Sequence, residues 1–275
     1  MEIRNINTAI KLNNDIEMPL LGLGTWQING NQAERSVLSA LAAGYRHIDT
    51  AAIYNNEDDV GRAIQKSGIP REEVFITTKL WNGDHGYKPA IAALDRSLKK
   101  LGLSYVDLYL IHWPVENQRN ETWQSMEAIL ESGKCRAIGV SNYTIRHLEQ
   151  LMRQSTTIPA VNQVEFSPYL YQKDLLGFCR NNGIQLESYS PLTRGRKLDD
   201  SRLVAMAGKY GKSTAQILIR WALQSGIVTI PKASKEEHIR ENADVFDFIV
   251  SSEDMQTLDS FNEPLRICWD PTEVD

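Results

Sequence analysis

The chain has 275 residues, of which 42% are hydrophobic and 24% charged, so it is long enough and apolar enough to bury a sizeable core. Its formal net charge is −5 and no basic run stands out, which argues against nucleic acid or an anionic membrane as a partner. The sequence has no apolar leader and no apolar run of about 18 residues, so we expect a cytoplasmic protein.

Residues 8–19 predict a short hairpin that turns at Asn13 and Asn14. After it, short apolar runs suited to buried parallel strands alternate with longer amphipathic stretches suited to helices. The strand candidates are residues 19–24, 45–49, 73–79, 105–112, 135–141, 160–165, 184–190 and 227–232. The helix candidates include 32–44, 56–68, 88–102 and 122–134, which end at Gly44, Gly68, Gly102 and Gly133, where left-handed C-caps are expected.

This alternation over 275 residues predicts one (β/α)8 TIM barrel, a single domain over residues 1–275. The hairpin falls outside the repeat, and we expect it to cover the bottom of the barrel. A doubly wound sheet is the alternative fold. It is weakened because Gly22 and Gly24 are not followed by the third glycine of a dinucleotide fingerprint, and no helix follows directly.

The cysteines and histidines show no metal-ligand spacing, so no metal is expected. Cys135, Cys179 and Cys268 are far apart and suggest no disulfide framework. We interpret Cys135 and Cys179 as small buried hydrophobic residues. Trp221 lies in an apolar helical stretch, residues 215–224, and is interpreted as part of the core.

Polar residues gather where the predicted strands end. In a barrel these carboxyl ends meet at one face, which carries the active site. One such residue alone can simply reach solvent, but repetition at successive strands favours a shared site. The residues are Asp49, Lys79, His112, Ser141, Asn142, Gln163, Glu165, Tyr189, Ser190 and Lys232.

Tyr54 follows the strand-end Asp49 closely and suits proton donation to an oxygen that gains negative charge. A phenol has an unperturbed pKa near 10, which a nearby cation such as Lys79 would lower. Asp49 could hold that ammonium by a charge-assisted hydrogen bond, and His112 could polarise a carbonyl oxygen. Such a site fits the reduction of a carbonyl by hydride. In a simpler interpretation, residues 54–56 form a turn and Asp49 caps the next helix.

The sequence resembles the aldo-keto reductase superfamily over nearly the whole chain, especially its small prokaryotic-type members that reduce aldehydes, dicarbonyls and keto sugars. The matching stretches are GYRHIDTAAIYNNE, VFITTKLWN, LDRSLKKLGLSYVDLYLIHWP, RAIGVSN, VNQVEFSPYL, ESYSPL, IPKAS and ENADVFDF, in the family's order and at its spacing. The resemblance implies hydride transfer from nicotinamide C4 of NADPH to an aldehyde or ketone, with Tyr54 as proton donor. The implied catalytic tetrad is Asp49, Tyr54, Lys79 and His112.

The resemblance also implies which residues bind the cofactor. Ser141, Asn142 and Gln163 would hold the nicotinamide carboxamide, and Tyr189 would stack on its ring. Lys232 would contact the 2′-phosphate. The loop that begins with Ser190 and Leu192 would cover the pyrophosphate, Glu241 and Asn242 would contact the adenine, and further contacts are implied at Gly24, Thr25, Trp26, Asp49, Ala233, Ser234 and His238.

The substrate, a small carbonyl compound, would lie in an aromatic cleft. A C-terminal specificity loop would form part of it near the active site. The implied substrate contacts are Trp26, Tyr54, Trp81, His112, Trp113 and Trp269.

Two positions depart from the family's pattern near the implied phosphate contact. Ala233 stands where Ser or Thr is usual, and His238 stands where Arg is usual. A histidine with an unperturbed pKa of about 6.5 is mostly neutral at pH 7.5, unlike an arginine. We therefore expect NADPH to be preferred by a reduced margin, with NADH also used.

An alternative from another class is a nucleotide-binding regulatory or structural protein on the same fold, without catalytic activity. The unaltered tetrad argues against it. A cofactor-independent barrel hydrolase is a further alternative, but Lys79 beside Tyr54 offers no nucleophile arrangement for it. A monomer is expected, because no apolar surface stripe stands out.

Overall fold

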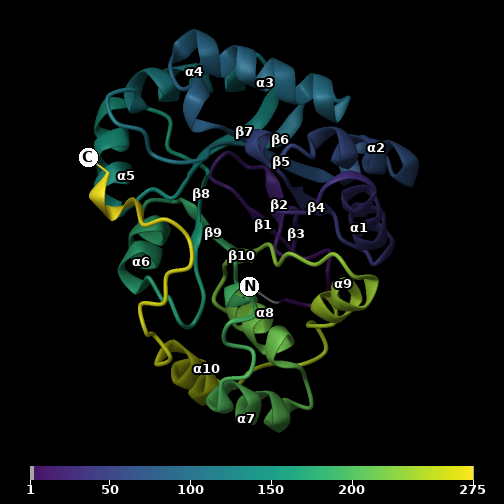
Figure 1. Ribbon diagram of the computed structural model, residues 1–275. Helices are drawn as coiled ribbons and strands as arrows, with labels where there is room; N and C mark the ends of the chain where they lie inside the picture. Colours follow the sequence, from purple (N-terminus) through teal and green to yellow (C-terminus); the bar gives the residue numbers. More distant parts are fainter. Residues whose placement is uncertain (1–2, 275) are drawn as a thin grey trace.

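Parallel strands form the centre of the structure, and helices form a ring around them (Figure 1). The computed structural model describes residues 3–274. Each of the eight barrel strands pairs in parallel with the next along the chain, which confirms the predicted (β/α)8 barrel. The strands are β3 (Leu23–Gly24), β4 (His47–Asp49), β5 (Phe75–Leu80), β6 (Val106–Ile111), β7 (Cys135–Ser141), β8 (Val161–Glu165), β9 (Gln185–Tyr189) and β10 (Val228–Thr229).

The barrel closes where the chain around β3 meets the chain around β10. A parallel bridge joins Gly24 to Lys232, and the N–H of Gly22 donates to the carbonyl oxygen of Thr229 at 2.9 Å. A Cβ on Gly24 would lie 2.8 Å from the carbonyl oxygen of Ile230, and one on Gly22 would lie 2.9 Å from the Ile230 side chain. Close packing at this seam therefore explains both glycines, and the doubly wound alternative is wrong.

Helices connect successive strands and pack around the outside of the barrel (Figure 1). All four helices specified from the sequence are present, and Gly44, Gly68, Gly102 and Gly133 have φ of 96°, 68°, 65° and 74°, as left-handed C-caps require. The helices are α1 (Gly30–Ala42), α2 (Glu57–Ser67), α3 (Tyr87–Leu101), α4 (Arg119–Glu131), α5 (Ile145–Gln154), α6 (Lys173–Asn181), α7 (Ser201–Tyr210), α8 (Thr214–Gln224), α9 (Glu236–Ala243) and α10 (Ser252–Asp259).

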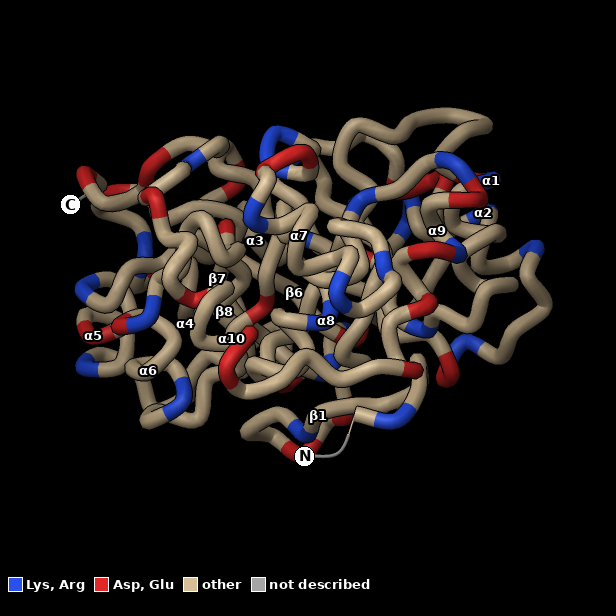
Figure 2. The backbone as a smooth tube through the Cα atoms, turned by 90° about the horizontal axis from the view of Figure 1, so that it is seen from below, with Lys and Arg blue, Asp and Glu red and all other residues tan. Residues whose placement is uncertain are grey.

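The predicted hairpin consists of β1 (Ala9–Lys11) and β2 (Glu17–Pro19), which pair antiparallel. The side-chain amide of Asn14, in its turn, donates to the carbonyl oxygen of Arg136 at 2.8 Å, near the beginning of β7. The hairpin therefore covers the amino ends of the strands, as expected. Figure 2 shows β1 at the lower edge of the molecule.

Cys135, Cys179 and Trp221 are buried in the core, which confirms their interpretation as packing residues. Lys and Arg are interspersed with Asp and Glu along the backbone in Figure 2. Between residues 3 and 274, no helix combines the length and the apolar character that a membrane crossing requires.

Candidate active site

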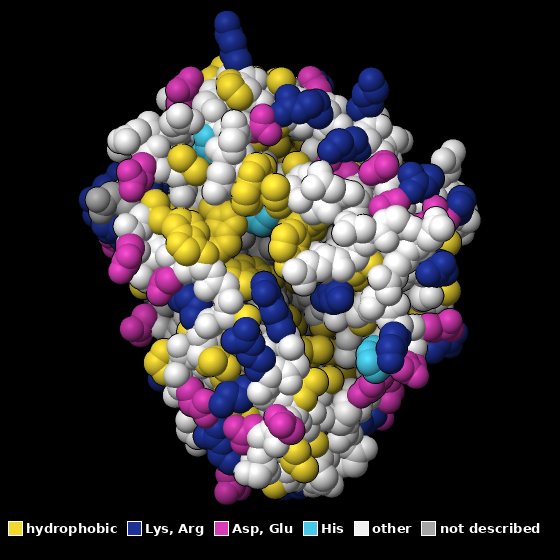
Figure 3. Space-filling view, in the orientation of Figure 1, with side chains coloured by type: hydrophobic (Ala, Val, Ile, Leu, Met, Phe, Trp, Pro, Cys, Tyr) yellow, Lys and Arg dark blue, Asp and Glu magenta, His cyan; other side chains and the backbone are white. Residues whose placement is uncertain are grey.

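The polar residues predicted from the strand ends lie together at the carboxyl ends of the barrel strands. Asp49 is the last residue of β4, Lys79 lies near the end of β5, and His112 directly follows β6. Figure 3, seen from the same side as Figure 1, shows hydrophobic side chains gathered around a hollow with a histidine at its floor. This hollow is the candidate active site.

A short connection between β4 and α2 brings Tyr54 back over the end of its own strand. Tyr54 ends a 3-10 helix, Asn55 is left-handed with φ of 55°, and Asn56 begins the next helix. The buried Asn56 side chain fixes this turn, because its Oδ1 accepts a hydrogen bond from the Thr50 hydroxyl at 2.6 Å. The turn that the simpler interpretation predicts is therefore present. The second part of that interpretation, that Asp49 caps the next helix, is wrong, because the N-cap residue of α2 is Asn56.

The Lys79 ammonium links Asp49 to Tyr54. Its Nζ donates to Asp49 Oδ1 at 2.6 Å, to the carbonyl oxygen of Thr50 at 2.9 Å and to the Tyr54 hydroxyl oxygen at 3.3 Å. The side chains of Lys79 and Asp49 are only 0% and 2% exposed. Since the Tyr54 oxygen accepts from the ammonium, its own O–H is left to donate elsewhere.

Burial and charge have opposite effects on the pKa values of Asp49 and Lys79. Burial raises the pKa of Asp49, and the nearby Lys79 opposes that shift. Burial alone would lower the pKa of Lys79, but the negative charge of Asp49 and smaller contributions from Tyr54 and Glu187 raise it above its usual value. Lys79 is therefore held as an ammonium at neutral pH.

The pKa of Tyr54 differs from the sequence-based expectation. Burial raises it to about 12, although Lys79 lowers it and Asp49 raises it in turn. Lys79 therefore does lower the pKa of Tyr54, as expected, but the net pKa still lies above its usual value. The loss of solvent around the phenol outweighs the attraction of the cation, so Tyr54 stays protonated through the neutral range.

His112 lies beside Tyr54, with ring centroids 5.7 Å apart. Burial, and to a lesser degree the charge of Lys79, holds the pKa of His112 well below its usual value. The imidazole is therefore neutral and carries one N–H that can donate. The Tyr54 hydroxyl and the His112 ring can thus both donate a hydrogen bond to one oxygen atom.

Tryptophan rings form the walls around these two residues. The Trp26 ring lies 4.8 Å from Tyr54, and Trp269 packs on Trp113 with centroids 5.0 Å apart. Trp26 and Trp269 are 39% and 55% exposed, so they border the opening of the hollow. The structure therefore brings together all the predicted tryptophans, Trp26, Trp81, Trp113 and Trp269.

The C-terminal segment is tied to the barrel by Glu165, a buried residue at the end of β8. Its carboxylate accepts the backbone N–H of Ile267 at 2.7 Å and that of Cys268 at 2.9 Å. These bonds place Trp269 directly over the aromatic wall. The predicted C-terminal loop near the active site is confirmed.

The predicted carboxamide-binding residues form a chain of hydrogen bonds that reaches Asp49. Tyr189 O–H donates to Asn142 Oδ1 at 2.8 Å, and Asn142 Nδ2 donates to Ser141 Oγ at 3.0 Å. Ser141 Oγ donates to the carbonyl oxygen of Gln163, whose Nε2 donates to Asp49 Oδ2 at 2.8 Å. Asn142 is also left-handed, with φ of 64°, and such backbone outliers cluster at functional sites.

The predicted phosphate-binding residues lie on the other side of the closing seam, on and just before α9. Lys232 is exposed, and the half-exposed His238 has its Nε2 3.6 Å from the carboxylate of Glu237. Lys235 Nζ lies 3.7 Å from the same carboxylate. Within residues 3–274, no side chain caps the beginning of α9, so its backbone N–H groups are free to meet an anion. Ala233 and Asn242 are buried beside this site, and Ser234 and Glu241 are partly buried.

The remaining predicted cofactor contacts lie beside the tetrad or at the loop after β9. Thr25 Oγ1 donates to the carbonyl oxygen of Asp49 at 2.8 Å, which fixes the chain after Gly24 against β4. Ser190 is left-handed, with φ of 50°, and begins a tight turn that includes Leu192.

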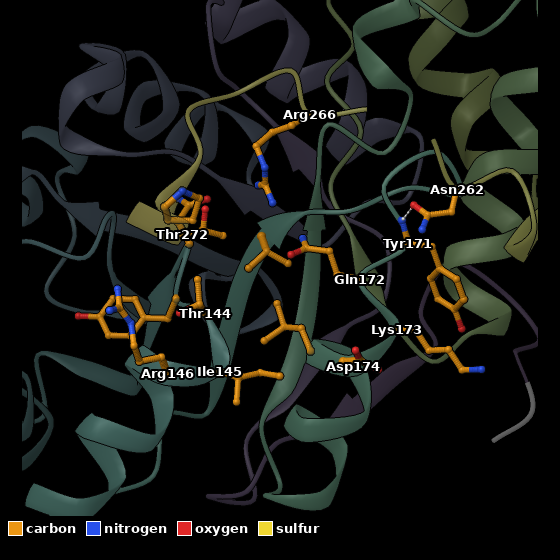
Figure 4. Close-up of a pocket in the computed structure, with 15 residues that line it drawn as sticks. Thr144, Ile145, Arg146, Tyr171, Gln172, Lys173, Asp174, Asn262, Arg266 and Thr272 are labelled. Atoms are coloured by element: carbon orange, nitrogen blue, oxygen red, sulfur yellow. Dashed lines mark hydrogen bonds between the residues drawn. The ribbon is translucent and has the colours of Figure 1, made fainter. Parts of the chain in front are cut away.

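A cavity of about 600 Å³ opens beside the tetrad rather than over it. It lies between the beginnings of α5 and α6 and the C-terminal segment, from which Arg266 reaches into it (Figure 4). Asn142 lines this cavity, but no residue of the tetrad does. The cavity is therefore separate from the hollow and touches the predicted carboxamide-binding set at Asn142.

Sequence reasoning missed Glu187, a carboxyl buried in β9 below the site. Its Oε2 accepts a hydrogen bond from Gln163 Nε2 at 2.9 Å. A signal was present in the sequence, because Glu187 interrupts an apolar strand and stands two residues before Tyr189, on the same strand face.

Known proteins resemble this chain along almost its whole length. A model of the Aldo/keto reductase family matches residues 20–263. The chain is 50% identical to the glyoxal reductase of Bacillus subtilis over 271 residues, which cover 98% of each chain. One similar solved structure is an aldo-keto reductase from a Medee basin deep-sea metagenome library, with a TM-score of 0.94, 46% identity, and coverage of 98% of this chain and 100% of that one. Another is the Bombyx mori aldo-keto reductase in complex with NADP, with a TM-score of 0.89, 38% identity and coverage of 94% of each chain.

Proposed function

Since this chain belongs to the aldo/keto reductase family, we propose that it is an NADPH-dependent carbonyl reductase that reduces aldehydes or ketones, such as dicarbonyls, ketoesters and keto sugars. One observation carries the proposal. The buried Lys79 ammonium lies 2.6 Å from the Asp49 carboxylate and 3.3 Å from the Tyr54 hydroxyl, at the floor of an aromatic hollow. A relative named glyoxal reductase supports small dicarbonyls as one class of substrate.

The residues present fit a nicotinamide dinucleotide cofactor. Ser141, Asn142 and Gln163 offer the hydroxyl and amide groups that a carboxamide needs, and Tyr189 offers a ring for stacking. Lys232 and the free N–H groups at the beginning of α9 offer charge and donors for a phosphate. When bound, the reduced nicotinamide supplies the hydride.

In this proposal Tyr54 donates the proton to the carbonyl oxygen. Its O–H points away from Lys79, because its oxygen already accepts from the ammonium. As the carbonyl oxygen gains negative charge, the phenol gives up its proton and Lys79 stabilises the phenolate. A pKa of about 12 keeps the proton on Tyr54 until that charge develops.

His112 orients the same oxygen in this proposal. Its neutral ring donates a hydrogen bond without adding a charge that would disturb Lys79. The surrounding tryptophans exclude water, which strengthens both interactions.

The proposal is tested by following the loss of NADPH absorbance with phenylglyoxal or 4-nitrobenzaldehyde. We expect turnover with at least one of them, and a panel of carbonyl compounds scored by kcat/KM would then rank the substrate classes. If NADPH binds, as measured by fluorescence, but no carbonyl compound is reduced, the chain is instead a catalytically idle nucleotide-binding protein.

Asp49→Asn should reduce both stability and rate. The substitution removes the carboxylate that pairs with the buried Lys79 ammonium, and losing one partner of a buried pair typically costs about 3–5 kcal/mol. Chemical denaturation and kcat measured on the same preparation check this prediction. If neither quantity changes, Asp49 does not hold Lys79 in place.

His238→Arg should widen the preference for NADPH over NADH. An arginine is permanently charged, and at position 238 that charge would attract only the cofactor that carries the 2′-phosphate. The Glu237 carboxylate, 3.6 Å from the His238 ring, would compete for the new guanidinium. The measurement is the ratio of kcat/KM for the two cofactors in wild type and in the variant.

The size of this effect is bounded by one new interaction. We expect His238→Arg to strengthen NADPH binding by at most about 1.5–3 kcal/mol, the value of one charge-assisted hydrogen bond. A preference that does not respond to the arginine would show that position 238 does not meet the phosphate.

A further inference from the structure

Glu187 lies in the middle of β9, directly below the candidate active site, and is 0% exposed. Its Oε2 is 2.9 Å from Gln163 Nε2, and the same nitrogen donates to Asp49 Oδ2 at 2.8 Å. One amide group therefore connects Glu187 to the ion pair of Asp49 and Lys79. Any change of charge at Glu187 occurs within this network.

The charges in this buried cluster balance only if Glu187 carries a proton. Asp49 contributes one negative charge and Lys79 one positive charge. His47 lies beside Glu187, and burial lowers the pKa of His47 to about 3, so its ring is neutral. An ionised Glu187 would be a second buried carboxylate without a cation of its own, which is costly.

The hydrogen bonds of Glu187 agree with a protonated carboxyl group. Its Oε1 has no hydrogen-bond partner within residues 3–274, and the nearby His47 Nε2 lies 3.6 Å away. The imidazole nitrogen is already paired with the Thr77 hydroxyl at 3.2 Å. A buried carboxylate oxygen without a donor is unfavourable, whereas a neutral acid carries no negative charge that needs one.

We propose that Glu187 is a positioning residue that is carried as a neutral carboxylic acid, and that loss of its proton biases the site toward the oxidised nicotinamide. The inference rests on the proposed function in one respect, the binding of a nicotinamide cofactor in this site. Oxidised nicotinamide carries a positive charge and the reduced ring does not, so a negative charge below the site favours only the oxidised form. In a buried site, where the effective dielectric constant is low, such an attraction is only weakly screened.

The expected pH range follows from the surroundings of Glu187. Burial, and then repulsion by Asp49, raises its pKa to about 8, while Gln163 and Lys79 oppose the shift. Below that pH the acid is neutral, and above it the carboxylate forms. NADP⁺ should therefore bind more tightly relative to NADPH as the pH rises through about 8.

The other ionisable groups that face Glu187 do not produce this pH dependence. These groups are His47 and Asp49 from β4 and Lys79 from β5. From the adjacent β8, the uncharged Gln163 faces Glu187. His47 is already neutral below this pH range, and the pKa of Lys79 lies above its usual value. Asp49 stays paired with Lys79.

The first test reads the proton on Glu187 directly and needs no turnover. Infrared spectra of the whole protein without cofactor, titrated from about pH 6 to about pH 10, should show the band of a protonated carboxylic acid that disappears near pH 8. Glu187→Gln should lack this band at every pH. If wild type lacks the band at the acidic end, or if Glu187→Gln retains it unchanged, the inference is wrong.

The second test measures the dissociation constants of NADP⁺ and NADPH by protein fluorescence over the same pH range. In wild type, the Kd of NADPH divided by the Kd of NADP⁺ should rise by about fivefold or more as the pH increases. Fivefold is the lower end of typical couplings between sites. Glu187→Gln should keep the ratio that wild type shows at neutral pH, because an amide resembles the neutral acid in shape and charge. It should lose the pH dependence.

Glu187→Asp is the conservative control, because it retains a carboxyl group that can lose a proton. It should restore a pH-dependent ratio, and it keeps the inference testable if Glu187→Gln does not fold. A ratio that stays constant in wild type, or that changes equally in Glu187→Gln, overturns the inference. If both cofactors bind with the expected ratios but no carbonyl compound is reduced, the proposed function fails while this inference stands. Failure to bind either cofactor overturns both.

Discussion

Tyr54→Phe is expected to lower kcat by about 10²- to 10⁴-fold, the usual contribution of general acid catalysis, while the Kd for NADPH changes little. The substitution removes only the hydroxyl that lies 3.3 Å from Lys79 Nζ, and leaves the ring that packs against Trp26 and His112. Since cofactor binding does not depend on that hydroxyl, the loss should be in the chemical step. The measurements are kcat, with the isotope effect of deuterated NADPH, and a fluorescence titration of the cofactor.

A second buried tyrosine provides the matched control. Tyr109 in β6 is fully buried, and its hydroxyl has no hydrogen-bond partner within residues 3–274. Tyr109→Phe therefore removes the same atom from the same barrel away from the tetrad, and should leave kcat near that of wild type. If Tyr54→Phe keeps more than about a tenth of wild-type turnover while the isotope effect shows that hydride transfer limits the rate, Tyr54 is not the proton donor.

The sequence predicts the barrel well because buried parallel strands and amphipathic helices leave different periodic patterns. The predicted strand 135–141 coincides with β7, in which every residue except Arg136 is buried. The prediction for 19–24 was less accurate, because Pro19 belongs to the hairpin and only Leu23–Gly24 joins the barrel as β3. The beginning of β3 is determined by close packing where the barrel closes. Such contacts join segments that are distant in the sequence, so they leave no local periodic pattern from which the boundary could be predicted.

The members of the candidate site were predictable, but their energetics were not. The rule that catalytic groups gather at the carboxyl ends of barrel strands places Asp49, Lys79 and His112 on one face. The rule does not say how deeply each side chain is buried, and burial decides the pKa of Tyr54. Glu187 was missed for a related reason, because it lies below the strand ends, where the barrel interior is usually apolar.

Lys79→Met is expected to abolish most activity. The substitution removes the cation 3.3 Å from the Tyr54 oxygen, so the pKa of Tyr54 should rise above its already elevated value. A weaker acid donates its proton more slowly, so kcat should fall over the whole range from about pH 6 to about pH 10, which lies below the pKa of Tyr54. The measurement is kcat over this range with saturating NADPH. An unchanged kcat would mean that Lys79 does not act on Tyr54.

The double variant Asp49→Asn/Lys79→Met separates a catalytic role of the pair from a structural one. Either single substitution leaves one buried partner of the 2.6 Å ion pair alone, whereas the double substitution removes both charges and leaves none uncompensated. We therefore expect the double variant to regain much of the roughly 3–5 kcal/mol that Asp49→Asn loses. If the pair only holds the fold together, activity should return along with stability. If the ammonium supplies the field that stabilises the Tyr54 phenolate, stability alone returns and kcat stays as low as in Lys79→Met.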